Sequence, residues 1–329
     1  MKKLSVILPV YNGEAFITKC IDSLLAQENI DLNTIEILVI NDGSTDSSLD
    51  MLTNYAKQYS NIFTIIDQEN KGAAATRNKA IAAATGEYVT LIDQDDWVDT
   101  DYVQTLLSAV EDGVTDVAQV GYKLVNTDKR VIKEVMPINT HFGQLLAIPA
   151  WAKIYETNFL KKNAIFFFEN NIGEDSLFTL RVWLLSKAYK TVMYAGYNNY
   201  FDNQTNVTNS LHKGLSVKVN IIKLLDEMIT IRSTEKNQQG LLDYNIIRTA
   251  MYYLLSYGKY AKPERFIEVY NELFQWLKSN IPNFKRNKYI WAKPAGEHAI
   301  ASIGVKLIMS INSLNAVRLF AKVYCRNYR

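Results

Sequence analysis

The stretch Tyr88-Val-Thr-Leu-Ile-Asp-Gln-Asp-Asp96 decides the fold, because an apolar run ends there in a group of carboxylates. The apolar part predicts a buried strand. In an extended backbone, residues i and i+2 point to the same side, so Asp93 and Asp95 are expected to project together just beyond that strand. Open α/β sheets bind ligands at this end of their strands. Two convergent carboxylates suit a hard divalent cation, which can hold a diphosphate, although an isolated D-x-D is more often a solvated acidic turn.

Three further segments combine an apolar strand pattern with a polar turn. They are Leu4–Val10 before Tyr11-Asn-Gly13, Ile35–Ile40 before Asn41-Asp-Gly-Ser-Thr-Asp46, and Ile62–Ile66 before Gly72-Ala-Ala-Ala-Thr76. Helical patterns separate these strands through the first 100 residues. Such alternation predicts right-handed βαβ units. The expected fold class is therefore α/β, with a mostly parallel mixed sheet flanked by helices.

The remaining periodicity predicts further elements along the chain. Helices are expected at Ala15–Gln27, Ser48–Tyr59, Ala73–Ala84, Asp101–Glu111, Trp151–Leu160 and Asp175–Ser186. Strands are expected at Val117–Val125, at Val131–Val135 and at Thr191–Tyr200, the last as a strand pair or as a strand and turn. After about residue 212 the strand signal ends, and helices are expected at Ser216–Arg232, Leu241–Tyr260 and Pro263–Asn280.

Taken together, the motifs resemble those of the family-2 glycosyltransferases, which are inverting nucleotide-sugar enzymes with the GT-A fold. The matching residues follow the family order: Pro9-Val-Tyr-Asn12, Asn41-Asp-Gly-Ser-Thr-Asp46, Asn70-Lys-Gly72 with Ala75-Thr-Arg-Asn78, Gly86-Glu-Tyr88 with Asp93-Gln-Asp-Asp96, and Gly173-Glu-Asp175. The resemblance covers roughly residues 4–210. It implies a GT-A domain at 1–212, with a nucleotide-sugar-binding half at 1–100 and an acceptor-side half at 101–212, and a helical C-terminal region at 213–329.

The resemblance implies a donor site at the first motifs. Asp95 is expected to bind Mn²⁺ or Mg²⁺, and Asp93 to lie closer to the ribose. Asp42 is expected to accept a hydrogen bond from uracil, and an Asx turn is its structural alternative. The remaining donor-binding residues are expected to be Pro9, Val10 and Tyr11 at the base, and Arg77 at the base or the diphosphate. A salt bridge is the alternative for Arg77, and Asp96 either assists the metal or caps a helix beginning near Val98.

The later acidic pair Glu174-Asp175 is implied to lie at the acceptor side, with Asp175 as the catalytic base. Its alternative is an N-terminal cap for the helix that follows. The chain departs from the family at Tyr200–Ser210, where members often carry basic residues and this sequence has none. His212 and Lys213 lie just beyond and are the candidate substitutes. The Gln-x-x-Arg-Trp signature of processive synthases is also absent from the sequence, which favours single-sugar addition.

Bulk properties limit the class of protein. No run of about 18 apolar residues occurs in the 329, and the two cysteines, Cys20 and Cys325, suggest no disulfide framework. A cytoplasmic protein is therefore expected. The net charge is +2, yet the first 101 residues carry 16 acidic and 7 basic side chains. The basic excess reaches the tail, where an apolar stripe from Ile303 to Tyr324 predicts either a docking helix, on the main domain or a dimer partner, or a helix lying on the inner face of the cell membrane.

The expected function is metal-dependent, inverting transfer of a single sugar from a UDP-sugar. The acceptor is expected to be a glycan, lipid-linked or protein-linked, in bacterial surface-glycan synthesis; no nucleic-acid motif is found. Two rivals remain open. A nucleotidyltransferase would need a Gly-rich, Lys- or Arg-bearing loop after the first strand, which Tyr11-Asn-Gly-Glu-Ala15 matches poorly. A non-catalytic GT-A-like subunit that binds a glycan or a partner glycosyltransferase would be expected to have lost the acidic motifs, which are intact here.

Overall fold

The computed structural model describes residues 2–169, 173–201, 215, 220–233 and 238–325. The chain divides into two compact units. The first unit comprises Met1–Asn139, Ala147–Glu169 and Glu174–Asp202, and the second comprises Thr140–Leu146, Asn170–Gly173 and Asn203–Arg329. The domain boundary expected at residue 212 lies outside the described residues.

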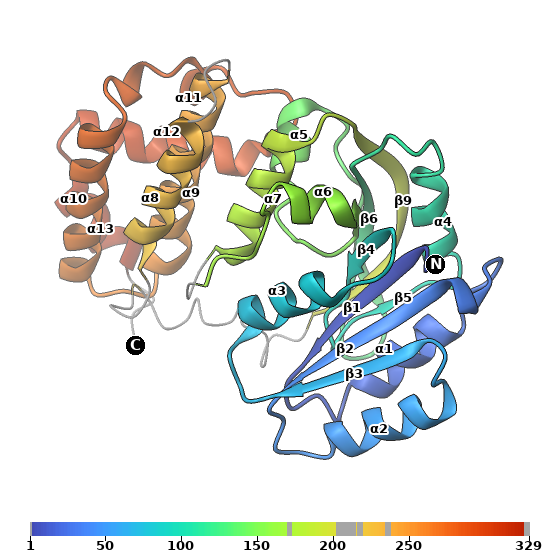
Figure 1. Cartoon of the computed structure of the whole chain (residues 1–329). Coiled ribbons are helices and arrows are strands. Elements are labelled where there is room, and N and C mark those ends of the chain that lie inside the picture. The colour runs from blue at the N-terminus through green and yellow to red at the C-terminus, as the bar shows by residue number, and fades with distance from the viewer. Residues whose placement is uncertain (1, 170–172, 202–214, 216–219, 234–237, 326–329) are drawn as a thin grey trace. The chain divides into compact units, whose positions relative to one another are not determined.

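The first unit is built on one mixed sheet of nine strands (Figure 1). The strands are β1 (Leu4–Val10), β2 (Ile35–Asp42), β3 (Phe63–Gln68), β4 (Tyr88–Leu91), β5 (Trp97–Val98), β6 (Val117–Val125), β7 (Val131–Val135), β8 (Lys153–Glu156) and β9 (Tyr189–Tyr200). Their order is β3-β2-β1-β4-β8-β6-β9-β5, with β7 paired to β6. Strands β3, β2, β1 and β4 are mutually parallel, whereas β8 is antiparallel to both of its neighbours.

Helices cover both faces of this sheet, which explains why its first strands are apolar without alternation. On one face, α1 (Ile17–Leu25), α2 (Ser48–Gln58) and α4 (Tyr102–Ala109) contribute to a core with the residues of one side of β1 and β2. On the other face, α3 (Ala73–Ala83), α6 (Thr157–Lys162) and α7 (Glu174–Leu185) form a second core. Every residue of β2 is buried. The predicted α/β class is confirmed.

Three local predictions were wrong. The helix expected at Trp151–Leu160 is instead strand β8 followed by the short helix α6, because Lys153–Glu156 lies between β4 and β6 and fills a gap in the sheet. The segment expected as a strand pair or a strand and turn is the single strand β9. The helix start near Val98, considered for a cap by Asp96, is not observed, because Trp97–Val98 pairs with β9 as β5; the helix begins at Tyr102, within the predicted Asp101–Glu111.

The second unit is helical. It contains α5 (His141–Leu145), α8 (Ile221–Ser233), α9 (Gln239–Gly258), α10 (Pro263–Asn280), α11 (Lys288–Trp291), α12 (Ala299–Ser313) and α13 (Val317–Tyr324). Helix α9 packs against α8, α10 and α12, and α13 packs against α10. The bounds predicted for α10 are those observed, with Pro263 in its first turn, where a missing N–H costs nothing.

The apolar stripe of the tail does not form one continuous buried face. The helix breaks after Ser313, and Asn315 adopts a left-handed φ of 52° before α13 begins. Of the predicted stripe, Ile311, Val317 and Ala321 are buried, whereas Ile303, Leu307 and Leu314 are exposed; Val305 and Ile308, outside the stripe, are also buried. None of the described helices is long and apolar enough to span a bilayer.

Candidate active site

Three loops meet beyond the carboxyl ends of β1, β2 and β4. The Asn12 backbone N–H donates to Ser44 Oγ at 3.0 Å, and Thr45 N–H donates to Asn12 Oδ1 at 2.8 Å. Gln94 joins the third loop: its amide nitrogen donates to the Tyr11 carbonyl at 3.0 Å, and its amide oxygen accepts from Tyr11 N–H at 2.9 Å. A Cβ at Gly13 would lie 2.6 Å from Gln94 Oε1, so a larger residue there would displace the Gln94 side chain from this position. The sequence reasoning did not assign a role to Gln94.

Asp42 lies at the end of β2, buried, in the second of these loops. Its Oδ1 accepts from Gln68 Nε2 at 2.7 Å and from Lys71 N–H at 2.8 Å, and its Oδ2 accepts from Gly72 N–H at 2.9 Å. Desolvation by burial would raise the pKa of Asp42, but these hydrogen bonds outweigh it and the pKa is lowered. Asp42 is therefore a carboxylate held in the ionised form. These partners lie 26 to 30 residues away in sequence, so they are not the local contacts of the Asx turn that was the structural alternative. They leave part of the acceptor capacity of Oδ2 unused.

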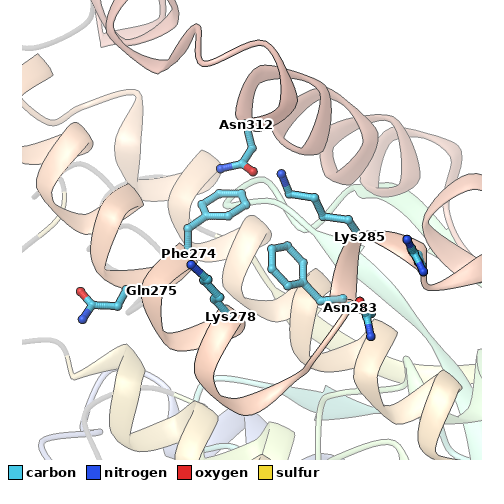
Figure 2. Close-up of a pocket in the computed structure, with 8 residues that line it drawn as sticks. Phe274, Gln275, Lys278, Asn283, Lys285 and Asn312 are labelled. Atoms are coloured by element: carbon cyan, nitrogen blue, oxygen red, sulfur yellow. The ribbon is translucent and has the colours of Figure 1, made fainter.

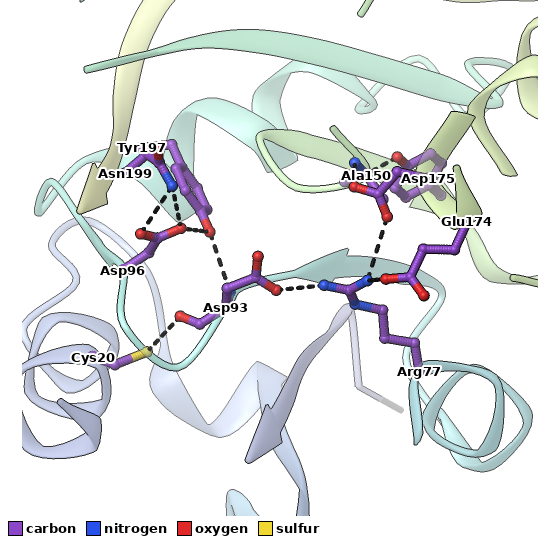
Figure 3. A network of polar contacts seen from close by, with 10 residues as sticks. Cys20, Arg77, Asp93, Asp96, Ala150, Glu174, Asp175, Tyr197 and Asn199 are labelled. Atoms are coloured by element: carbon purple, nitrogen blue, oxygen red, sulfur yellow. Dashed lines mark hydrogen bonds and ion pairs between the residues drawn. The ribbon is translucent and has the colours of Figure 1, made fainter. Parts of the chain in front are cut away.

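Arg77 joins carboxylates that are far apart in the sequence (Figure 3). Its side chain comes from α3 and is buried. One guanidinium nitrogen lies 2.7 Å from Asp93 Oδ1, and the other lies 2.8 Å from Glu174 Oε1 and 3.3 Å from Asp175 Oδ1. The structure thus brings the D-x-D turn and the later acidic pair to one place. In this cluster Arg77 forms salt bridges, which was the structural alternative to a contact with the donor.

Asp96 is turned away from this guanidinium and toward β9. Its carboxylate accepts hydrogen bonds from Tyr197 Oη at 2.6 Å, from Asn199 Nδ2, and from Tyr200 N–H at 2.7 Å. Tyr197 Oη also accepts from Asp93 N–H at 3.2 Å, so one phenol ties the acidic turn to the strand (Figure 3). Burial and then the neighbouring Asp95 raise the pKa of Asp96. The predicted role of Asp96 as a helix cap was wrong, because its carboxylate binds residues of β9 and the next helix starts only at Tyr102.

Asp95 is the carboxylate of this turn that stays unengaged. No other described side chain donates a hydrogen bond to it or forms an ion pair with it, whereas Asp93 and Asp96 are both held. Burial, and then the charge of Asp93, raise its pKa to about 6. An unpaired carboxylate beside two others is a donor set that fits a hard divalent cation. Across the described ranges, no three His, Cys, Asp or Glu side chains are gathered in a ready-made metal cluster.

The acidic pair begins helix α7, so its carboxylates lie at the positive end of that helix dipole. Asp175 Oδ2 also accepts from Ala150 N–H at 3.2 Å. Burial raises the pKa of Asp175, and Asp93 raises it further, although Arg77 acts in the opposite direction. A second unforeseen group is Lys153, which is fully buried in β8, donates to the Pro149 carbonyl, and interacts electrostatically with Asp175. Burial lowers its pKa to about 7. A lysine inside an apolar run was the signal that could have identified it.

The other predicted site residues divide into three groups. Pro9 and Val10 end β1, with Val10 buried, and Tyr11 is 47% exposed beside them. Glu174 lies within the Arg77 cluster. His212 and Lys213 lie outside the described residues.

Comparisons with known proteins identify similar glycosyltransferases. Similar curated proteins include Glycosyltransferase GlyA of Streptococcus pneumoniae, 32% identical over 204 residues, which are 56% of this chain and 28% of GlyA. They also include the poly(ribitol-phosphate) beta-glucosyltransferase of Bacillus spizizenii, 33% identical over 205 residues, which are 60% of this chain and 32% of that enzyme. The chain thus matches about a third or less of these two relatives' length.

Two groups of solved structures share the fold. S. aureus TarS 1-349 in complex with UDP-GlcNAc has a TM-score of 0.67 at 20% identity, covering 95% of this chain and 92% of that one. Mannosyltransferase PcManGT from Pyrobaculum calidifontis, in complex with GDP-Man and Mn²⁺, has a TM-score of 0.56 at 14% identity, covering 98% and 86%. The family model described as glycosyl transferase family 2 matches residues 5–172, more than half of the chain. With its motifs in the family order and its fold that of the GT-A enzymes, the chain belongs to glycosyl transferase family 2.

Proposed function

We propose that this family-2 glycosyltransferase moves a single sugar from a UDP-sugar to a glycan, lipid-linked or protein-linked acceptor, with inversion and with a divalent metal. The biological setting we propose is bacterial surface-glycan synthesis at the cytoplasmic face of the membrane. The observation that carries the proposal is the convergence of Asp93, Glu174 and Asp175 on Arg77. Donor-side and acceptor-side acids of one transferase must lie this close, because the sugar passes directly between the two substrates.

The donor nucleotide is proposed to bind over the three loops beyond β1, β2 and β4. Asp42 Oδ2 has a lone pair available for a uracil N–H, while Oδ1 is held by Gln68 and Lys71. Tyr11 is exposed at the same edge and offers a ring face to the base. Binding of UDP-GlcNAc by the structural neighbour TarS supports a uridine donor.

The metal is proposed to be Mn²⁺ or Mg²⁺, with Asp95 as its protein ligand and Asp93 beside it. When bound, such an ion neutralises the charge that develops on the leaving diphosphate. The support is the unpaired carboxylate of Asp95 and the Mn²⁺ in the PcManGT structure. Asp93 holds Arg77 in place, and Asp96 fixes the conformation of the turn through Tyr197 and Tyr200.

Asp175 is proposed as the general base. It would take the proton of the acceptor hydroxyl as that oxygen attacks the anomeric carbon, so that one displacement inverts the configuration. A base works best with a pKa near the working pH, and burial raises the pKa of Asp175 in that direction. Arg77 then positions the carboxylate and limits the rise.

One observation favours a non-catalytic alternative. The carboxylates of Asp93, Glu174 and Asp175 are already paired with Arg77, as they would be in a protein that keeps the fold and binds a glycan or a partner transferase. The two functions differ in donor turnover. The test is a panel of UDP-sugars with Mn²⁺, in which UDP release is measured with and without candidate acceptors. We expect UDP to be released from one of the donors, and we expect EDTA to abolish this release. Binding of UDP without UDP release from any donor would favour the non-catalytic alternative.

A further inference from the structure

A cavity in the helical unit is lined by none of the residues proposed for catalysis. Its volume is about 660 Å³, within the range of small-ligand sites in proteins. It is lined by the C-terminal half of α10, the turn after it and α12, and the lining residues are Phe274, Gln275, Lys278, Asn283, Phe284, Lys285, Arg286 and Asn312. All of them belong to the second unit.

The lining combines positive charge with an apolar floor. Lys278, Lys285 and Arg286 are exposed, and within the described part of the chain none of them forms an ion pair. Figure 2 shows the side chains of Lys278, Lys285 and Asn312 arranged around the ring of Phe274. The rings of Phe274 and Phe284 are buried and 5.9 Å apart. Gln275 and Asn283 add amide groups, and so does Asn312, whose Nδ2 already donates one hydrogen bond to Tyr270 Oη at 2.7 Å.

The charge around the cavity is unbalanced over a long stretch of chain. From residue 273 to the end of the sequence there are ten basic residues and one acidic residue, Glu297. Glu297 is buried and lies 2.8 Å from Arg248, so it is already neutralised within the unit. The three cations of the cavity therefore have no acidic neighbour in sequence to compensate them. A ligand that brings negative charge would complement these cations.

We propose that this cavity binds a phosphate-bearing segment of the acceptor glycan. Cations and amide N–H groups around one hollow suit a phosphate, which offers several acceptor oxygens to separate donors. The apolar floor suits the carbon backbone of a sugar or polyol between phosphates. A hollow fits a chain rather than a flat lipid surface. The inference rests on the proposed function only for calling this ligand the acceptor.

The reaction requires the acceptor's hydroxyl, and not its charge, at the catalytic carboxylates. An anionic anchor in the helical unit would hold a long acceptor by a segment other than the one that reacts at Asp93 and Asp175. Because the first 101 residues are net acidic, a polyanionic acceptor would be repelled there and needs such an anchor. The cavity thus assigns to the helical unit the selection of phosphate-bearing acceptors.

The test compares two double variants with the same change in charge. Lys285→Gln/Arg286→Gln removes cations of the cavity, and Arg318→Gln/Lys322→Gln removes two exposed cations of α13 that do not line it. All four side chains are exposed, so both proteins are expected to fold as the unaltered chain does. The full chain is titrated by calorimetry with a short poly(ribitol phosphate) oligomer, with alginate as a carboxylate chain, with dextran as a neutral chain, and with anionic vesicles.

We expect the oligomer to bind the unaltered chain more tightly than either alginate or dextran binds it. The cavity variant should lose about tenfold in affinity, and the slope of log K against log salt should fall by about two, one for each cation removed. The α13 variant should keep both values. Equal losses in the two variants, equal binding of alginate, or an effect of the cavity variant on vesicles alone would overturn the proposal.

Separate titration with UDP and Mn²⁺ distinguishes failure of this inference from failure of the proposed function. Both variants should bind UDP as the unaltered chain does. If UDP binds and sugar transfer proceeds but the oligomer does not bind, the cavity proposal is wrong and the proposed function stands. If the oligomer binds at the cavity but no UDP-sugar is turned over, the phosphate site stands and the proposed function is wrong.

Discussion

Replacing Arg77 with Met tests the central ion cluster. The guanidinium is 10% exposed, and its three partners Asp93, Glu174 and Asp175 are 24–29% exposed. Met keeps most of the apolar stem and removes the charge, so that three carboxylates are left without their counter-charge. Removing one partner of a buried ion pair costs about 3–5 kcal/mol. Because the carboxylates retain about a quarter of their exposure and water screens them partly, we expect a loss of about 2–4 kcal/mol in the free energy of unfolding.

The loss should depend on pH in a definite direction. Burial already raises the pKa of Glu174 and of Asp175, and Arg77 opposes that rise. Without Arg77 the folded-state pKa of each carboxyl moves further above its unfolded value. The folded variant then binds more protons than the unfolded chain, so its stability increases as pH falls. The difference from the unaltered chain should therefore be largest near pH 8 and smaller near pH 5.

The assay is urea denaturation followed by far-UV circular dichroism at both pH values. Arg130→Met is the matched control, because Arg130 is exposed beside the turn between β6 and β7 and no ion pair of its side chain is found among the described residues. We expect the control to change stability by less than about 0.5 kcal/mol. An equally small change for Arg77→Met at pH 8, or a loss that grows as pH falls, would refute the electrostatic reasoning.

Three further changes test single residues. Asp95→Ala should remove Mn²⁺-dependent donor turnover while the circular dichroism spectrum stays unchanged, since the side chain has no described partner; retained activity that still needs metal would exclude Asp95 as a ligand. Asp175→Asn should preserve UDP binding by calorimetry and lower transfer by about 10²–10⁴-fold, the usual contribution of a general base; lost UDP binding would place Asp175 on the donor side. Lys153→Met should raise stability by up to about 4 kcal/mol below pH 7, because burial lowers the pKa of Lys153 to about 7 and the charged form is costly. That gain should fade as pH rises from 7 toward 10.5, where the unfolded lysine also loses its proton; a gain that persists at pH 10 would contradict it.

The sequence was informative where local chemistry determines structure. The strand before Asp93, the turn after β2 and the bounds of α10 follow from apolar runs, turn residues and a first-turn proline, all of which act over short distances. The family order of the motifs supplied the GT-A fold, which the structural neighbours share.

The errors arose where long-range pairing decides. The sequence around Lys153–Glu156 has a helical pattern, but the segment is a strand because it pairs with both β4 and β6. Motif spacing in the sequence could not predict the hydrogen bonds of Tyr197 with Asp93 and Asp96, because these residues are about 100 positions apart. Nor could it predict the pairing of Arg77 with Asp175, because that pairing depends on how α3 and α7 lie on one face of the sheet. The cavity of the helical unit is of the same kind, since α10 and α12 are brought together by packing on α9 and by the hydrogen bond from Asn312 to Tyr270.

The most direct test of the proposed reaction is the configuration of the sugar at the moment of its release. Water can take the place of the acceptor, so the measurement needs no knowledge of the natural glycan. Proton NMR spectra recorded in the first minutes of UDP-sugar hydrolysis with Mn²⁺ distinguish the α and β anomers before they interconvert. From an α-linked donor we predict the β anomer first, and its loss when Asp95 is replaced with Ala. Release of the α anomer first would contradict a single displacement with Asp175 as the base.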